Sequence, residues 1–148
     1  MFGESLLSII EEESSSTEVQ KGDSITTFIN RIEGWKTRCK NLHWSAPKKN
    51  IHEYLDDFLD ILSDYQDNLA EVYQGIAGQF APNMLKGIPC DALNAQDFIN
   101  EVDIKTREFY SALSDDVNYV GIKSECETFI NNIKKYIYLF RLTDIRPY

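Results

Sequence analysis

Residues 42–75, LHWSAPKKNIHEYLDDFLDILSDYQDNLAEVYQG, contain both histidines of the chain and decide its fold. From Ile51 to Ile76 the apolar residues are spaced alternately four and three apart, which is typical of a helix with one buried stripe. They are Ile51, Leu55, Phe58, Leu62, Tyr65, Leu69, Val72 and Ile76. Asn50 is the expected N-cap, with Glu53 completing a capping box. The stretch therefore predicts a long amphipathic helix that follows a short, proline-containing loop.

A second stripe of this helix consists of carboxylates. Its members are Glu53, Asp57, Asp60, Asp64, Asp67 and Glu71. At about 100° per residue they lie roughly opposite the apolar stripe. No Lys or Arg occurs between Ile51 and Ile76, so these charges repel one another unless water, a partner or a cation offsets them. The stripe is either a solvated face or a place where cations bind.

Three further segments show the same apolar spacing. The first helix begins after a cap at Asp23 or Ser24 and has a stripe from Ile25 to Ala46. Two more helices are predicted at about residues 93–113 and 122–142. Between the second and third helices, two prolines and two glycines within residues 78–92 predict a long connection. No segment competes as a strand, so we predict an all-α fold, a four-helix bundle over residues 24–148.

Composition restricts the functional classes. A chain of 148 residues fits one domain, and its net charge of −9 disfavours binding to nucleic acid. Three cysteines without CxxC spacing predict reduced thiols of a cytoplasmic protein. We expect neither a signal peptide nor a membrane-spanning segment. Residues 1–23 form an acidic N-terminal segment, which is either a frayed terminus or a docking segment for a subunit or protein partner.

The histidines and the carboxylates together favour a metal site. Asp67 and Glu71 are four residues apart and hence neighbours on one helical face, a spacing that lets two carboxylates bind one cation. His43 closes the first helix and His52 opens the second, so the loop brings both to one end of the hairpin. Two imidazoles with two carboxylates suit iron, manganese or zinc, and the carboxylate content favours non-haem iron. The simpler alternative is that His43 is an ordinary packing residue.

Several motifs resemble the Dps family of miniferritins, within the ferritin-like superfamily. They are Leu-His-Trp at residues 42–44, His-Glu-Tyr-Leu-Asp at 52–56 and Asp-Asn-Leu-Ala-Glu at 67–71. KKYIYLFRL at 134–142 is similar to the family's closing helix, with Tyr138 in place of the usual tryptophan. The resemblance covers residues of roughly 25 to 142 and is strongest at 42–76. The spacer between the two histidines is shorter than usual in the family, by about one helical turn.

The resemblance implies a ferritin-like bundle that binds iron, oxidises Fe²⁺ with peroxide or dioxygen, and stores ferric iron in a twelve-subunit shell. His43 and His52 would supply one half of each ferroxidase site, and Asp67 and Glu71 of the two-fold related subunit the other. The pattern of the helix agrees with this implication. Asp67 and Glu71 lie opposite the apolar stripe, so they can meet the histidines only across a subunit boundary.

The acidic N-terminal segment bears on DNA binding and on an alternative function. The first 23 residues hold one lysine and six acids, unlike the lysine-rich tail through which some family members bind DNA, so we expect DNA binding to be weak or absent. The alternative function is a structural or interaction protein, for example virus- or assembly-associated. It would keep the ferritin-like bundle without ferroxidase activity and bind a partner through its acidic face and N-terminal segment.

Overall fold

The computed structural model describes residues 22–143, and in that range the chain forms four α-helices and no strand. They are α1 (Ile25–Trp44), α2 (Lys49–Ala77), α3 (Ala95–Ala112) and α4 (Val120–Thr143), with the short 3-10 helix η2 (Val117–Tyr119) before α4. The predicted all-α, four-helix architecture is therefore confirmed for these residues. Residues 1–21, nearly all of the predicted N-terminal segment, lie outside the described range.

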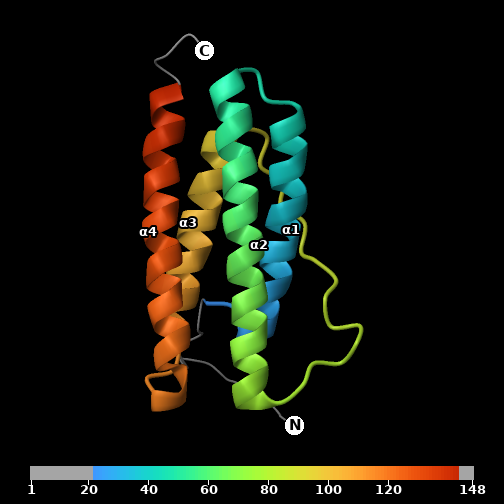
Figure 1. The fold of residues 1–148 in the computed structure, drawn as a ribbon, viewed down its shortest axis with the longest axis vertical. Helices are drawn as coiled ribbons and strands as arrows, with labels where there is room; N and C mark the ends of the chain where they lie inside the picture. The colour runs from blue at the N-terminus through green and yellow to red at the C-terminus, as the bar shows by residue number, and fades with distance from the viewer. Residues whose placement is uncertain (1–21, 144–148) are drawn as a thin grey trace, which may run out of the picture.

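The helices follow one another around the bundle in the order α1, α2, α4, α3. Figure 1 shows α1 and α4 running in one direction and α2 and α3 in the other, so neighbouring helices are antiparallel. The chain must then travel the length of the bundle between α2 and α3. Residues 78–94 do this alongside α1 (Figure 1). The turn between α1 and α2 therefore lies at the same end of the bundle as the start of α3.

Several helix ends follow from local sequence signals. The Ser24 hydroxyl accepts a hydrogen bond from the backbone N–H of Thr27 at 3.3 Å and caps α1. The Asn94 side chain caps α3 in the same way, accepting from Asp97 N–H at 2.8 Å. α2 ends before Gly78, whose φ of +96° is a backbone conformation that glycine adopts without strain.

The start of α2 differs from the prediction. Lys48, not Asn50, flanks the helix, and Lys48 makes no side-chain cap hydrogen bond. Asn50 lies inside the first turn, where its side-chain oxygen accepts from Ile51 N–H at 2.9 Å. The Lys48 ammonium instead donates to the backbone carbonyl of Thr143 at the end of α4. A tertiary contact thus fixes this turn, and the local capping pattern cannot show it.

The apolar stripes meet in one core rich in aromatic rings. Phe28 of α1 stacks on Phe109 of α3 with ring centroids 3.9 Å apart, and Tyr65 of α2 stacks on Phe129 of α4 at 4.2 Å. The predicted stripe of α2 fails at Val72, which is 38% exposed because α2 extends beyond the start of α1 (Figure 1). α3 begins at Ala95, slightly later than predicted, so Leu93 lies outside the helix and is 84% exposed.

Asn30 bonds the connection between α2 and α3 to α1, and Gly34 lets the connection approach the helix closely. The Asn30 side-chain oxygen accepts from the backbone N–H groups of Lys86 and Gly87 at 2.6 and 2.9 Å. Its backbone carbonyl accepts from Ile88 N–H at 2.9 Å. At Gly34 an added Cβ would lie 1.6 Å from the Ile88 carbonyl oxygen. The close approach of the connection to α1 therefore requires glycine at this position.

Candidate metal centre

His43 and His52 lie against each other at the turn between α1 and α2. Their rings stack with centroids 3.8 Å apart and an angle of 19° between the planes. His43 Nδ1 is 2.8 Å from the His52 carbonyl oxygen, and His52 Nδ1 is 2.8 Å from the His43 carbonyl oxygen. The last turn of α1 and the first turn of α2 thus hold the two predicted histidine ligands side by side.

These reciprocal hydrogen bonds decide which nitrogen is free. A carbonyl oxygen only accepts, so each Nδ1 must carry the proton that it donates. In the neutral imidazoles this leaves Nε2 of each ring with an in-plane lone pair. Histidines that bind metal ions commonly use one ring N–H to bond a carbonyl or carboxylate, which fixes the ring and the tautomer. The pair therefore has the hydrogen-bonding arrangement that is common among metal-binding histidines.

Asp56 is a neighbour of this pair that was not among the predicted ligands. Its Oδ1 lies 3.9 Å from His43 Nε2, and its side chain is 64% exposed. The signal in the sequence is its position four residues after His52, which places both on one face of α2. This carboxylate could bind an ion held by His43 after a small change of rotamer.

Asp67 and Glu71 lie far from the histidines in the same chain. Both are exposed on α2, one turn apart. Asp67 follows His52 by fifteen residues, which at 1.5 Å per residue is about 22 Å along the helix. Within residues 22–143 no group of three or more His, Cys, Asp or Glu side chains could hold a metal ion. The structure thus brings the four predicted residues together as two pairs, not as one site.

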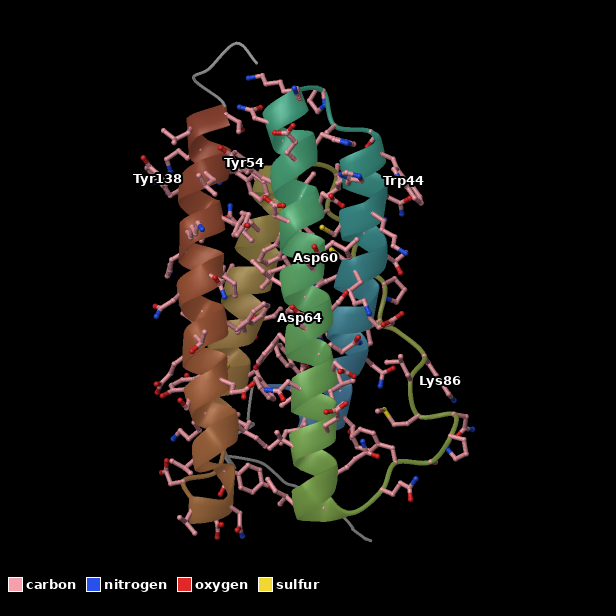
Figure 2. All side chains as sticks on the ribbon, viewed as in Figure 1. Trp44, Tyr54, Asp60, Asp64, Lys86 and Tyr138 are labelled. Carbon is pink, nitrogen blue, oxygen red and sulfur yellow. The ribbon has the colours of Figure 1, made fainter. Side chains whose placement is uncertain are left out.

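The carboxylate stripe of α2 faces away from the core, as predicted. All six of its members are exposed, and Figure 2 shows Asp60 and Asp64 on the outer surface of the helix. Near one end of the stripe, the carboxylate of Glu53 lies 4.0 Å from the ammonium of Lys49. Water solvates the carboxylates of such a face, and cations also have access to them there.

The three cysteines do not contribute to this centre. Cys39, Cys90 and Cys126 are buried and free of disulfides. Burial raises the pKa of the Cys39 thiol to about 12 and those of Cys90 and Cys126 to about 11. All three are buried in the core, and within residues 22–143 none belongs to a group of three or more His, Cys, Asp or Glu that could hold a metal ion.

Among the described helices, none has both the length and the apolar character needed to cross a bilayer. No protein-family model, curated protein or solved structure matches the chain.

Proposed function

We propose that the chain is the subunit of an iron-oxidising miniferritin with a ferritin-like bundle. Fe²⁺ is its substrate, bound between two subunits by His43 and His52 of one and Asp67 and Glu71 of the other. An oxidant, peroxide or dioxygen, takes the electrons, and ferric iron collects inside a closed shell. Resemblance to the Dps family favours twelve subunits in that shell, and a cytoplasmic setting in which the shell protects against iron and peroxide.

The stacked histidine pair is the observation that carries this proposal. A nitrogen lone pair lies in the plane of its imidazole, and the two planes are stacked with centroids 3.8 Å apart. Lone pairs in nearly parallel planes do not converge on one ion, but they can hold two ions, one at each histidine. Each histidine would therefore hold its own iron, as in the paired metal sites of enzymes.

The separation of the two pairs supports a site between subunits. About 22 Å of α2 separates His52 from Asp67. A two-fold axis that crosses α2 midway, close to Asp60, would place an antiparallel copy with its carboxylate pair opposite the histidine pair. Trp44, 72% exposed, directly follows His43. An interface at the histidine pair would cover this exposed side chain.

The course of the chain also supports the ferritin-like part of the proposal. Ferritin-like bundles consist of two antiparallel helix pairs joined by one long crossover. Here α1 pairs with α2 and α3 with α4, and residues 78–94 return the chain along the bundle between the two pairs (Figure 1).

The chemistry follows from the charges of the ligands. Neutral imidazoles bind Fe²⁺ without adding charge, and the carboxylates of Asp67 and Glu71 offset the extra positive charge of Fe³⁺. Glu71 would bridge the two irons. Two Fe²⁺ supply the two electrons that reduce one peroxide, with two protons, to two waters. The exposed acids Asp60 and Asp64 would attract cations toward the site without binding iron directly.

Rates of Fe²⁺ oxidation test the proposal. Glu71→Gln keeps the shape of the side chain but removes its charge, and we expect oxidation to slow by at least about tenfold. Asp57→Asn is the matched control, because it removes one charge from the same stripe outside the site, and its rate should stay close to that of the unmodified protein. Equal rates for the two variants, or oxidation no faster than in buffer, would exclude a ferroxidase site at Glu71.

One observation favours the alternative function, an interaction protein. The exposed carboxylate stripe is a large surface of one charge. Such a surface could bind a basic partner. Iron content separates the two functions: protein purified without chelator should contain iron in the first case and none in the second.

A further inference from the structure

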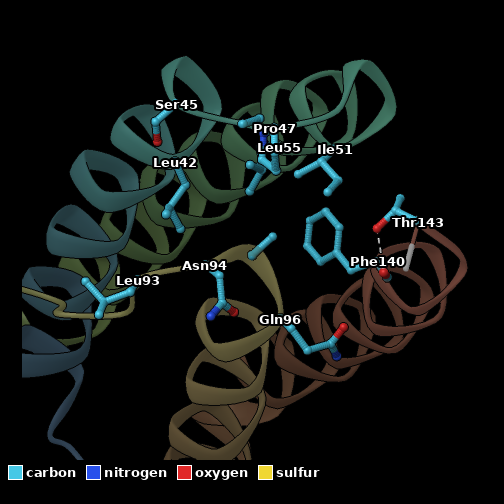
Figure 3. A pocket seen from close by; sticks show the side chains of 12 residues that line it. Leu42, Ser45, Pro47, Ile51, Leu55, Leu93, Asn94, Gln96, Phe140 and Thr143 are labelled. Atoms are coloured by element: carbon cyan, nitrogen blue, oxygen red, sulfur yellow. Dashed lines mark hydrogen bonds between the residues drawn. The ribbon is translucent and has the colours of Figure 1, made fainter. Parts of the chain in front are cut away.

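A mainly apolar cavity of about 280 Å³ lies where the α1–α2 turn, the start of α3 and the end of α4 meet (Figure 3). Leu42 and Ile51 line it from the two helices that the turn joins, Gln96 from α3 and Phe140 from α4. Leu93 belongs to the same wall and is 84% exposed, so the wall is open to solvent there. Apolar surface in contact with water favours an occupant that covers it.

Thr143, the last residue that the structure describes, also lines this cavity. Thr143 is 1% exposed, and its hydroxyl donates a hydrogen bond to the backbone carbonyl of Phe140 at 2.6 Å. Its own backbone carbonyl accepts from the ammonium of Lys48 in the α1–α2 turn. Residues 144–148 of the sequence therefore continue from a fixed point in the wall of the cavity.

Residues 144–148, Asp-Ile-Arg-Pro-Tyr, include two large side chains that suit an apolar cavity, Ile145 and Tyr148. An extended chain spans at most about 3.6 Å per residue, so Ile145 lies within about 7 Å of Thr143 and Tyr148 within about 18 Å. Both can reach a cavity whose wall includes Thr143. An apolar cavity of about 150 Å³ in another protein binds benzene. The larger volume here therefore has room for an aromatic ring and an aliphatic side chain together.

We propose that residues 144–148 dock in this cavity of their own chain, with the side chains of Ile145 and Tyr148 inside it. The docked segment would cover Leu93 and would join the end of α4 to the α1–α2 turn. The proposal goes beyond the proposed function and does not depend on it, because docking requires no metal ion.

Methyl NMR of the full-length protein tests this contact directly. The methyl groups of Ile145 should show nuclear Overhauser effects to the ring of Phe140 and to the methyl groups of Leu55, because both residues line the cavity. A mixture of chains labelled only at isoleucine and chains labelled only at leucine distinguishes docking in the same chain from docking in a second copy. Docking in the same chain gives no effect between Ile145 and Leu55 in that mixture.

Benzene is the probe for an empty cavity. A variant with Ile145→Asp and Tyr148→Asp should leave the cavity empty, because burying a carboxylate is costly. It should bind benzene at least about tenfold more tightly than the unmodified protein, in which the segment occupies the cavity. The matched control changes an exposed isoleucine and an exposed tyrosine outside the cavity, with Ile104→Asp and Tyr138→Asp. It should bind benzene as weakly as the unmodified protein, as measured by shifts of the Leu55 methyl resonances.

Three results would each overturn the proposal. The first is the absence of any contact between Ile145 and Phe140 in the full-length protein. The second is equal benzene affinity in the docking variant and the unmodified protein. The third is a contact between Ile145 and Leu55 in the mixture of differently labelled chains, which would show that the segment enters a second copy. None of these measurements involves iron, so a failure of docking and a failure of the ferroxidase proposal are distinguishable.

Discussion

His43 and His52 close the α1–α2 hairpin by bonding each other's backbone. The rings stack at 3.8 Å, and each Nδ1 donates to the carbonyl oxygen of the other residue at 2.8 Å. The pair is therefore a structural link between two helices as well as a candidate iron site, and the two roles can be measured separately.

Stability measurements test the structural link. We expect His52→Ala to lower the free energy of unfolding by about 1 kcal/mol, because it removes one hydrogen bond and the stacked ring. His43→Ala should have a similar effect, and the double variant should lose less than the sum, because the second ring stabilises little once the first is gone. Urea unfolding followed by circular dichroism measures all three. Trp44→Ala, an exposed neighbour, is the control, and strictly additive losses would contradict the link.

Mixed assemblies test whether the site is shared between subunits. Subunits with His43→Ala and His52→Ala should be inactive, as should subunits with Asp67→Asn and Glu71→Gln. When the two kinds are co-expressed, each mixed dimer rebuilds one complete site and loses the other, because a two-fold interface repeats every contact. Mixed dimers should therefore recover about half of the normal oxidation rate. Activity no higher than that of the parent variants would show that the site is not shared.

Replacing Gly34 and Gly75 with alanine should change the free energy of unfolding in opposite directions. Gly34→Ala forces a methyl group against the Ile88 carbonyl oxygen, 1.6 Å from the ideal Cβ position, and should lower the free energy of unfolding by about 1–3 kcal/mol. Gly75→Ala, near the end of α2, meets nothing within 4 Å and should raise it by roughly 0.5–1 kcal/mol, because alanine favours the helix. Thermal unfolding of the two variants checks the sign of each change.

Because three thiols are buried, we expect the free energy of unfolding to fall at alkaline pH. Their pKa values rise from 9.0 to about 11 or 12 on folding, so above pH 9 the unfolded chain loses protons that the folded chain keeps. The free energy of unfolding is unaffected by the thiols below pH 9 and falls between pH 9 and 11, by at most about 1.4 kcal/mol per pH unit for each thiol. Urea midpoints between pH 7 and 10.5 should show this, with a shallower decline in Cys126→Ala. Identical declines in the two proteins would contradict it.

Much of the bundle could be predicted because the information is local. The apolar spacing of residues 25–42, 51–69 and 122–140 places one side of each helix in the core, and a helix repeats that geometry wherever it lies. The same reasoning correctly placed the carboxylates of Asp67 and Glu71 on the outside. It failed at Asn50, because a contact with another helix, and not the local capping pattern, determines the start of α2.

Only the tertiary structure determines which residues meet across a turn or across the bundle. The sequence by itself determined that His43 and His52 lie at one end of a hairpin, but not that each ring bonds the other's carbonyl, which depends on the angle between α1 and α2. Likewise the position of Asp56 beside His43 Nε2 and the cavity at Gln96 follow from how three chain segments pack. Periodicity fixes the side of a helix that a residue occupies, whereas packing fixes which atoms on other helices it reaches.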